Sequence, residues 1–335
     1  MTKKLNPLPM SPYLRTLVWG GDRLAGYGKA VRPGDKVGES WEISGHRDGL
    51  SRVASGPLAG RTLPELIAEF GADLVGTAVP LDRPFPLLVK LIDAAEQLSV
   101  QVHPSDAYCA AHKLPDPGKP EAWYILEAAP GARIWKGLLP GTTRGKFEQL
   151  LAAGRLQECL RSFPAAAGDC IDLPAGVIHA IGAGILMAEV QQTSDLTYRA
   201  FDWNRVGLDG KPRQLHVREA LETIDFASLG GADFGDKVRP TTEPLPGGGR
   251  RLRLVANDKF EMEALELSAA HAIPADAARF SCVLVVDGAV KMEAGQWSER
   301  AGKGTSVLLP AAAGEVILAP ERTCRLLLAR PAPAK

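Results

Sequence analysis

The chain has 335 residues, of which 45% are apolar and 23% charged, as in an ordinary soluble globular protein. Lys plus Arg and Asp plus Glu number 39 each, so the formal net charge is zero. Binding to nucleic acid or to an anionic membrane requires a basic excess or cluster, and neither is present. A small anionic substrate remains compatible, since two or three local cations bind one. At this length we expect two cores, or one core with insertions.

The cysteines and the apolar stretches predict a cytoplasmic protein. Five cysteines are scattered without a C-x-x-C pair, which is typical of reduced thiols rather than of disulfides or a cysteine zinc site. The first ten residues lack the apolar centre of a signal peptide. The longest apolar stretch, AGVIHAIGAGILMAEV, is interrupted by glycines, His179 and Glu189 and is too short to span a bilayer.

Residues 11–56 contain short alternating segments separated by glycines, which predict β-strands. The segment GESWEISGH carries Trp41, Glu42 and His46. We expect Trp41 and the earlier Trp19 to pack in the core or at its rim. His46, followed by Arg and Asp, is expected to be a turn histidine rather than a metal ligand.

Residues 62–76 predict a helix, because Thr62 and Glu65 form a capping-box pattern before a one-sided apolar series. The run PFPLLVKLIDA at 84–94 predicts a strand whose only internal cation is Lys90. A lysine in such a run either extends outward at a sheet edge or points into a functional cavity. The local pattern leaves both possibilities open.

Residues 98–126 contain the largest group of candidate metal-binding and acid–base side chains in the sequence. Two strand-like pieces, LSVQVHP and KPEAWYIL, flank a polar loop. Gln101 and His103 are two residues apart, as are Lys119 and Glu121, so each pair shares one face of its strand. If both strands face one cavity, these groups form most of a metal site with an acid–base candidate. His179 in PAGVIHAIGAG is the best further ligand.

Two imidazoles, one carboxylate and an amide suit a zinc site with an open position, and they equally suit non-haem iron in an oxygenase. Structural histidines on β faces are the alternative without a metal. Downstream, Asp195, Arg199 and Arg205 follow. Arginines near a metal bind phosphate or a developing oxyanion. The alternative is a surface ion pair between Asp195 and Arg199.

The rest of the chain predicts two further helices and a second β unit. Residues 143–163 and 217–226 have helical patterns, and 240–250, dense in Pro, Gly and Thr, predict a linker. From 251 onward the pattern is that of a small barrel or jelly roll. GDCIDLPAGVIHAI in the first half resembles GTSVLLPAAAGEVI in the second, which favours two related jelly rolls with a metal in only one.

With these residues identified, the chain resembles the type I phosphomannose isomerases in their short bacterial form. The resemblance runs through VWGG, GESWEISGH, LLVKLIDAAEQLSVQVHPSD, GKPEAWYIL, LPAGVIHAIGAG and SDLTYRAFDW. It implies a mainly β, cupin-type double jelly roll with helical insertions and one zinc ion per chain. The implied division is a metal-binding catalytic domain at 1–239, a linker at 240–250 and a second jelly roll without metal at 251–335.

Position by position, the resemblance implies roles for the residues already singled out. The metal ligands fall on His103, Glu121, His179 and Gln101, and the active-site arginine on Arg199. The acidic neighbour falls on Asp195 and the cavity lysines on Lys90 and Lys119, while Arg205 is the nearest match to a phosphate-binding position and Glu42 is a further substrate-binding candidate.

The implied reaction interconverts mannose 6-phosphate and fructose 6-phosphate through a cis-enediol. We expect zinc to act as a Lewis acid. Lys119 is a plausible base, with Lys90, Asp195 and Glu42 as rivals, and Arg199 would stabilise the oxyanion or bind phosphate. The competing hypotheses are an iron-dependent cupin oxygenase and a sugar-binding cupin without turnover. The lysine, arginine and metal-ligand set favours the isomerase, and no obligatory protein partner is inferred.

Overall fold

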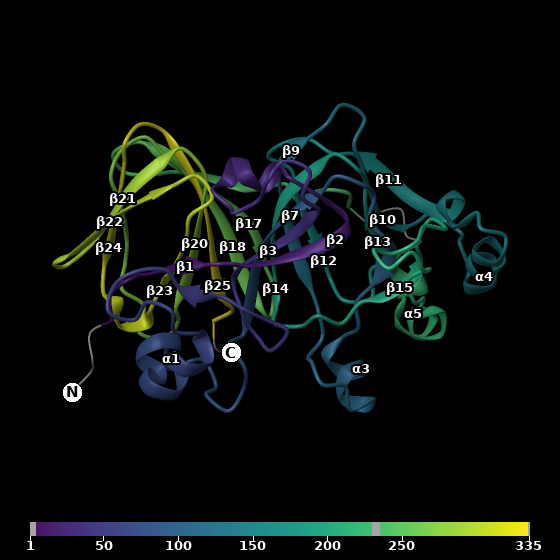
Figure 1. Cartoon of the computed structure of the whole chain (residues 1–335), viewed down its shortest axis with the longest axis horizontal. Helices are drawn as coiled ribbons and strands as arrows, with labels where there is room; N and C mark the ends of the chain where they lie inside the picture. Colours follow the sequence, from purple (N-terminus) through teal and green to yellow (C-terminus); the bar gives the residue numbers. More distant parts are fainter. Residues whose placement is uncertain (1–4, 230–234, 334–335) are drawn as a thin grey trace.

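The computed structural model describes residues 5–229 and 235–333. Its four larger sheets are antiparallel and lie side by side along the long axis of the molecule (Figure 1). The five- and six-stranded sheets form one sandwich, and the eight- and four-stranded sheets form the other. We call these the first and the second sandwich.

The strands of the first sandwich come from the first two thirds of the chain. The five-stranded sheet has the order β11 (Leu160–Pro164), β10 (Arg133–Leu138), β13 (His179–Ile181), β8 (Val100–Val102), β15 (Tyr198–Phe201). The six-stranded sheet has the order β12 (Cys170–Leu173), β9 (Glu121–Ala128), β14 (Ile185–Gln192), β7 (Leu87–Ala94), β3 (Val37–Ile43), β2 (Tyr13–Gly21).

The second sandwich combines the C-terminal strands with two from near the N-terminus. The eight-stranded sheet has the order β16 (Thr241–Pro244), β17 (Gly249–Ala256), β18 (Phe260–Leu267), β25 (Cys324–Pro331), β20 (Ser281–Asp287), β23 (Ser306–Leu309), β1 (Leu8–Ser11), β6 (Arg52–Val53). The four-stranded sheet has the order β19 (His271–Ile273), β24 (Val316–Pro320), β21 (Ala289–Ala294), β22 (Trp297–Gly302), and a small two-stranded sheet joins β4 (Gly45–His46) to β5 (Gly49–Leu50).

The six-stranded sheet is covered on both faces, and this decides which side chains reach the site. On β7, Leu87, Val89 and Leu91 belong to the apolar core shared with the eight-stranded sheet. Ile92 and Ala94 belong instead to the core shared with the five-stranded sheet. Side chains alternate between the faces of a strand, so the even-numbered positions of β7 point into the first sandwich.

The predicted mainly β fold, a cupin-type double jelly roll with inserted helices, is confirmed. The predicted linker at 240–250 is wrong, because β16 and β17 pair in register from Thr241 with Arg253 to Pro244 with Arg250. The Pro and Gly residues of this segment form the turn of a hairpin. The extent of the two domains stays a prediction, although the chain enters the second sandwich early, through β1 and β6.

Short helices lie at the periphery of the sandwiches (Figure 1). The helices are α1 (Leu63–Phe70), α2 (Ala72–Val75), α3 (Asp106–Ala111), α4 (Arg144–Ala152), α5 (Val217–Thr223), α6 (Phe226–Leu229) and the 3-10 turns η1 (Arg23–Tyr27), η2 (Leu156–Cys159), η3 (Ala311–Ala313). Within the described ranges, no helix combines the length and the apolar character needed to cross a membrane.

The predicted helices exist but end earlier than expected. At 62–76 the capping box forms, with Thr62 N–H donating to the Glu65 carboxylate at 2.7 Å, but Gly71 at φ 49° separates α1 from α2. At 143–163 the α-helix stops before Gly154, and residues 160–164 form β11 instead. The local pattern does not predict this β-strand, because its partner β10 is distant in sequence, with Arg133 paired to Pro164 and Leu138 to Leu160.

Candidate active site

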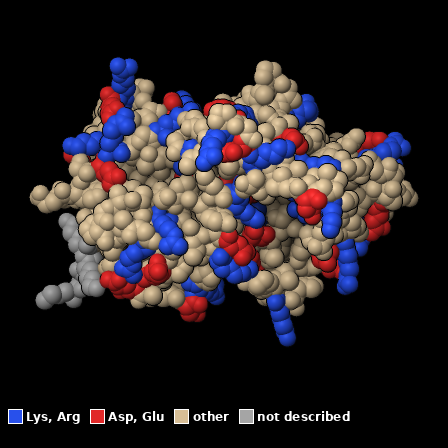
Figure 2. All heavy atoms as spheres, viewed as in Figure 1, with Lys and Arg blue, Asp and Glu red and all other residues tan. Residues whose placement is uncertain are grey.

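A polar cavity of about 220 Å³ opens between the two sheets of the first sandwich. Its polar lining comes from strands of both sheets and from the segments that lead into and out of β15: Arg15, Glu39, Lys90, Ser99, Gln101, Lys119, Glu189, Asp195, Thr197, Arg199 and Arg213. Acidic and basic side chains are intermixed on the face of the molecule seen in Figure 2. The cavity between the two sheets is itself lined by eight charged side chains of both signs.

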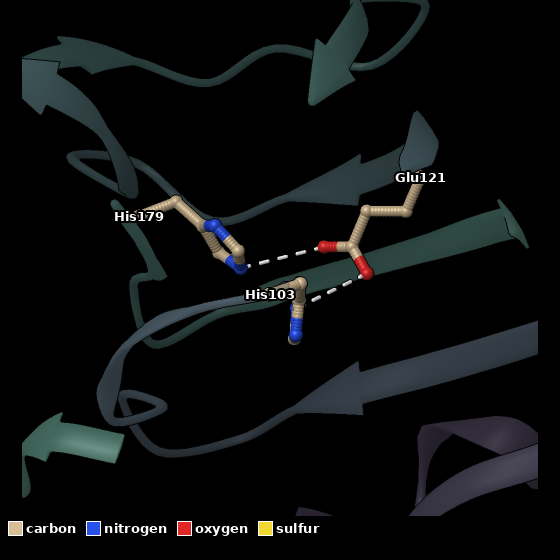
Figure 3. A group of neighbouring side chains, drawn as sticks. All are labelled: His103, Glu121 and His179. Carbon is tan, nitrogen blue, oxygen red and sulfur yellow. Dashed lines mark ion pairs between the residues drawn. The ribbon is translucent and has the colours of Figure 1, made fainter. Parts of the chain in front are cut away.

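His103, Glu121 and His179 converge beside this cavity, as Figure 3 shows. His103 follows β8, and Glu121 and His179 are the first residues of β9 and β13. His103 Nε2 lies 3.3 Å from Glu121 Oε2, and His179 Nε2 lies 3.4 Å from Glu121 Oε1. A tetrahedral ion with bonds of about 2.1 Å separates its ligands by roughly 3.4 Å, so these spacings fit a zinc-type site.

The hydrogen bonds around the imidazoles direct their second nitrogens toward this point. His103 Nδ1 lies 2.8 Å from the Leu196 carbonyl, and His179 Nδ1 lies 2.9 Å from the Val177 carbonyl. A carbonyl only accepts, so each Nδ1 carries the hydrogen and each Nε2 keeps its lone pair for a metal. Glu121 Oε1 is buried and has no hydrogen-bond partner among the described residues. An orphaned carboxylate oxygen facing an imidazole lone pair is the chemistry that a bound cation satisfies.

The electrostatics of the cluster also suit a cation. Burial lowers the pKa of His179 to about 3, despite the opposing effect of Glu121, so the ring is a neutral ligand at pH 7. Burial alone would raise the pKa of Glu121, but Lys119 and His103 outweigh it and the pKa lies well below its ordinary value. A neutral imidazole and an ionised carboxylate are the forms that coordinate metal.

Gln101 and Lys119 connect the cluster to the cavity. The Gln101 amide nitrogen lies 3.4 Å from His179 Nε2, and a half-turn of the amide would present its oxygen there as a fourth ligand. Lys119 Nζ donates to Glu121 Oε2 at 2.8 Å and lies 3.3 Å from His103 Nε2. Both residues line the cavity. Of the cationic side chains in its wall, Lys119 is the one in direct contact with the metal-type cluster.

Lys90 lies in the cavity wall, and the edge alternative is excluded by its 2% exposure. Its Nζ lies 3.1 Å from Glu189 Oε1 and 5.1 Å from the centre of the Trp41 ring. Burial alone would lower the pKa of Lys90, but the carboxylates of Glu189 and Glu39 raise it above the ordinary value. Lys90 is therefore held as an ammonium ion, which argues against it as the base.

Asp195 and Arg15 form an ion pair of 3.1 Å in the cavity wall, where each side chain is more than a quarter exposed. The predicted surface pair between Asp195 and Arg199 is replaced by this contact. Arg199 instead donates from Nη1 to the Gln214 carbonyl at 2.8 Å. Asp195 thus presents its carboxylate to the cavity together with an arginine from β2.

Arg213 lines the cavity together with Arg199, and Arg205 does not. Arg213 binds Asp202 through two hydrogen bonds of 2.6 and 2.7 Å, and Arg205 binds the same carboxylate and the Gln97 carbonyl. Burial and the nearby Arg213 guanidinium lower the pKa of Arg199. Because like charges repel each other there, an anion between Arg199 and Arg213 would be favoured. The expectation that Arg205 contacts substrate is not supported by its position.

Glu42 was expected to bind substrate, and its position contradicts this. It is fully buried and accepts hydrogen bonds from Lys29, Ser40 and Ser306 at 2.6, 2.6 and 2.7 Å. Ser306 belongs to β23 of the eight-stranded sheet, so Glu42 points out of the first sandwich. Glu39 on the opposite face of β3 lines the cavity instead.

Four charged residues of the cavity wall are not among the site residues predicted from the sequence: Arg15, Glu39, Glu189 and Arg213. Glu189 had a usable signal, because it is the only charge in the strand ILMAEVQQ. Alternation places Glu39 on the strand face of Trp41 but does not tell which face of the strand lines the cavity. Arg15 and Arg213 carry no local signal, since their approach depends on sheet order and on a loop.

Residues 8–122 match the family model described as phosphomannose isomerase type I, catalytic domain. The probable mannose-6-phosphate isomerase GmuF of Bacillus subtilis is 34% identical, over 97% of this chain and 99% of its own. The mannose-6-phosphate isomerase ManA of Bacillus subtilis is 35% identical, over 92% and 94%.

The fold agrees with these matches. The crystal structure of the mannose 6-phosphate isomerase from Bacillus subtilis superposes with a TM-score of 0.88 at 29% identity, covering 97% of this chain and 99% of that one. The similarity therefore extends over both sandwiches and includes the strands that carry the cavity residues.

Proposed function

The chain belongs to the type I phosphomannose isomerase family and is an isomerase, and we propose that it interconverts D-mannose 6-phosphate and D-fructose 6-phosphate through a cis-enediol, with one zinc ion. The observation that carries the proposal is the buried His103–Glu121–His179 cluster beside a cavity that is also lined by three arginines. The predicted cytoplasmic location and a sugar phosphate as the small-molecule partner belong to the same proposal.

The metal proposal assigns His103, Glu121 and His179 as ligands and Gln101 as the fourth. Nitrogen and oxygen donors without a thiolate, with room for a substrate oxygen, suit a catalytic rather than a structural zinc. When bound, the ion supplies Lewis-acid stabilisation of negative charge on the substrate oxygens. The Leu196 and Val177 carbonyls hold the two imidazoles in the tautomer that this requires.

The proton-transfer proposal assigns Lys119. Interconversion requires a proton to leave C2 of the aldose and return to C1, so the shuttling group must be close to the metal-bound end of the sugar. Lys119 Nζ already contacts two of the proposed ligands, at 2.8 and 3.3 Å. Lys90, held as an ammonium ion by Glu189 and Glu39, serves as a fixed positive charge near the developing oxyanion.

The substrate-binding proposal places the phosphate between Arg199 and Arg213. Two guanidinium groups suit a dianion, and Asp202 holds Arg213 in place through two hydrogen bonds. At the cavity wall, Asp195 is available to accept a hydrogen bond from a sugar hydroxyl while Arg15 fixes its carboxylate. Metal ligands at one side and cations at another would orient a six-carbon sugar phosphate along the cavity.

A coupled assay tests the function. Conversion of mannose 6-phosphate to fructose 6-phosphate would be followed on protein stripped with a chelator, and then on the same protein after zinc is restored. We expect activity to vanish and to return. Zinc binding without turnover of this substrate would overturn the proposal and favour a sugar-binding cupin, whereas recovery only with Fe(II) would overturn the zinc assignment.

A further inference from the structure

The motif GESWEISGH leaves His46 without a function, yet its ring is buried next to the cavity wall. His46 Nε2 lies 3.1 Å from Asp116 Oδ2. Asp116 belongs to the loop between α3 and β9 and is itself only 6% exposed. Arg47 donates to its other oxygen, Oδ1. A buried carboxylate with two basic partners is a built feature rather than a surface ion pair.

The direction of the His46 hydrogen bond follows from its other nitrogen. The backbone N–H of Asp48 donates to His46 Nδ1 at 3.2 Å. A backbone N–H only donates, so Nδ1 accepts and Nε2 carries the ring hydrogen. His46 is therefore a donor to Asp116, and its tautomer is fixed by the turn in which it lies.

Asp116 makes a third contact, and this one reaches the cavity. Its Oδ2 accepts a hydrogen bond from the backbone N–H of Asp195 at 3.1 Å. The Asp195 carboxylate accepts in turn from Arg15 at 3.1 Å. The Arg15 guanidinium lies 4.8 Å from the centre of the Trp41 ring, and the Trp41 ring meets His46 edge-on at 5.7 Å. The contacts form a closed ring through Asp116, Asp195, Arg15, Trp41 and His46.

We propose that Asp116 is a positioning residue that holds the backbone at Asp195, so that the Asp195 carboxylate faces the sugar in the cavity. His46 and Arg47 orient Asp116 for this task. The ring joins segments that are distant in sequence: Arg15 of β2, Trp41 of β3, His46 of β4, Asp116 of the loop before β9 and Asp195 of the segment before β15. The proposal rests on the proposed function, because it assigns Asp195 a contact with substrate.

The substitution Asp116→Asn removes the hydrogen-bond acceptor pattern of Asp116 without changing the size of its side chain. Both carboxylate oxygens accept from N–H donors, Oδ1 from Arg47 and Oδ2 from His46 and Asp195. An amide of the same size has one oxygen and one NH₂ group, so either orientation sets a donor against a donor. The variant keeps the volume of the side chain but loses either the hydrogen bond from Arg47 or the hydrogen bonds from His46 and the Asp195 backbone.

A double-mutant cycle in kcat/KM with mannose 6-phosphate tests the coupling. We expect Asp195→Ala to lower kcat/KM by on the order of a hundredfold and Asp116→Asn by about tenfold. Added to Asp195→Ala, Asp116→Asn should cost less than about twofold more, because the carboxylate that it positions is gone. The ratio of the change in kcat to the change in KM should also be the same for Asp116→Asn as for Asp195→Ala.

A second variant and a control guard against misfolding. Arg47→Ala removes a partner of Asp116 from a side chain that is more than half exposed, and we expect a loss of about threefold that also disappears with Asp195→Ala. Asp82→Asn, an exposed acid in a loop outside the cavity wall, should leave kcat/KM unchanged. Zinc content and the near-UV circular dichroism of each variant should match those of the unmodified protein.

The outcomes distinguish this inference from the proposed function. An unmodified protein without isomerase activity would overturn the function itself. An active protein in which the effects of Asp116→Asn and Asp195→Ala multiply fully, or in which either substitution has no effect, would overturn only the positioning role. Loss of activity from Asp116→Asn through lost zinc would also overturn it, because the effect would then act on the metal cluster.

Discussion

The first and second sandwiches share a local plan that is clearest at one turn. In the first sandwich β12 ends at Leu173, Pro174 follows, and the chain returns as β13 from His179. In the second, β23 ends at Leu309, Pro310 follows, and the chain returns as β24 from Val316. Both first residues are buried, but one is a metal-ligand candidate and the other is a valine. The same strand–turn–strand unit thus serves chemistry in one place and packing in the other.

The difference between the sandwiches lies in how burial is compensated. Burying ionisable groups is costly unless they are paired. In the first sandwich Lys90 lies against Glu189, and Lys119 against Glu121, so opposite charges share the desolvated space. At the corresponding depth of the second sandwich, Val316 and Leu318 of β24 join an apolar core. Inward positions thus carry paired charges in the first sandwich and apolar side chains in the second.

Substitution of the proposed metal ligands should have the largest effect on activity, and the effect should be confined to the first sandwich. We expect His103→Ala, Glu121→Ala and His179→Ala each to abolish zinc binding and to lower kcat/KM by at least about a thousandfold. His271→Ala is the matched control, because His271 begins β19 of the second sandwich and should leave both quantities unchanged. Metal analysis and the coupled assay check this. Stoichiometric zinc in all three ligand variants would contradict the coordination.

Arg199→Ala should have the next largest effect. The variant keeps the ligand cluster and should retain zinc, while kcat/KM falls by about a hundredfold because one of the two guanidinium groups that bind the phosphate is lost. Arg250→Ala, an exposed arginine on β17 paired with Glu266, is the control in the second sandwich. Near-normal kinetics of Arg199→Ala would remove Arg199 from the proposed machinery.

Arg213→Met should act mainly on binding. Because Arg213 lines the cavity and Arg205 does not, we expect KM for mannose 6-phosphate to rise about tenfold in Arg213→Met and less than about threefold in Arg205→Met. Inhibition by inorganic phosphate should weaken in the same order. A larger effect from Arg205→Met would restore the original expectation for that residue.

The buried His179 should leave a signature in the pH dependence of stability. Its folded pKa of about 3 lies below the ordinary value near 6.5, so between these values the unfolded chain binds the extra proton. Stability of chelator-treated protein should therefore fall as pH decreases through this window, by at most about 1.4 kcal/mol per pH unit for this one group. Urea unfolding from pH 6.5 to 5 checks this, and His179→Gln should flatten the slope, whereas an unchanged slope would contradict the assignment.

The metal cluster was predictable because its pattern is local. Two-residue spacing places Gln101 with His103 and Lys119 with Glu121, whatever the order of strands in the sheet. The C-terminal ends of the helices were harder to predict, because the apolar helical pattern continues past Gly71 and Gly154 whereas the helices end there. The composition of 240–250 predicts a linker although the segment forms most of a hairpin, because tight turns and linkers are both rich in Pro and Gly.

The rest of the cavity could not be predicted because it depends on sheet order and on strand phase. Arg15 meets Asp195 across 180 residues, and Lys90 meets Glu189 only through the register of β7 and β14. Glu42 was misplaced for a related reason. Trp41 and Glu42 are adjacent in sequence, and nothing local says which of two alternating faces turns toward the site.

The smallest effect on catalysis is expected for Glu42→Gln, on the face of β3 that points away from the cavity. Glu42→Gln should leave kcat/KM within about twofold, but it leaves the buried Lys29 without its ionic partner and should lower the free energy of unfolding by about 3 kcal/mol. Glu39→Gln, in the cavity wall, should show the opposite pattern. We expect it to lower kcat/KM more than Glu42→Gln does, because Lys90 and Arg15 lose a carboxylate partner, and to lower the free energy of unfolding less. Urea unfolding and steady-state kinetics of both variants check the contrast, and a catalytic defect in Glu42→Gln equal to that of Glu39→Gln would mean that the face of β3 does not separate site from scaffold.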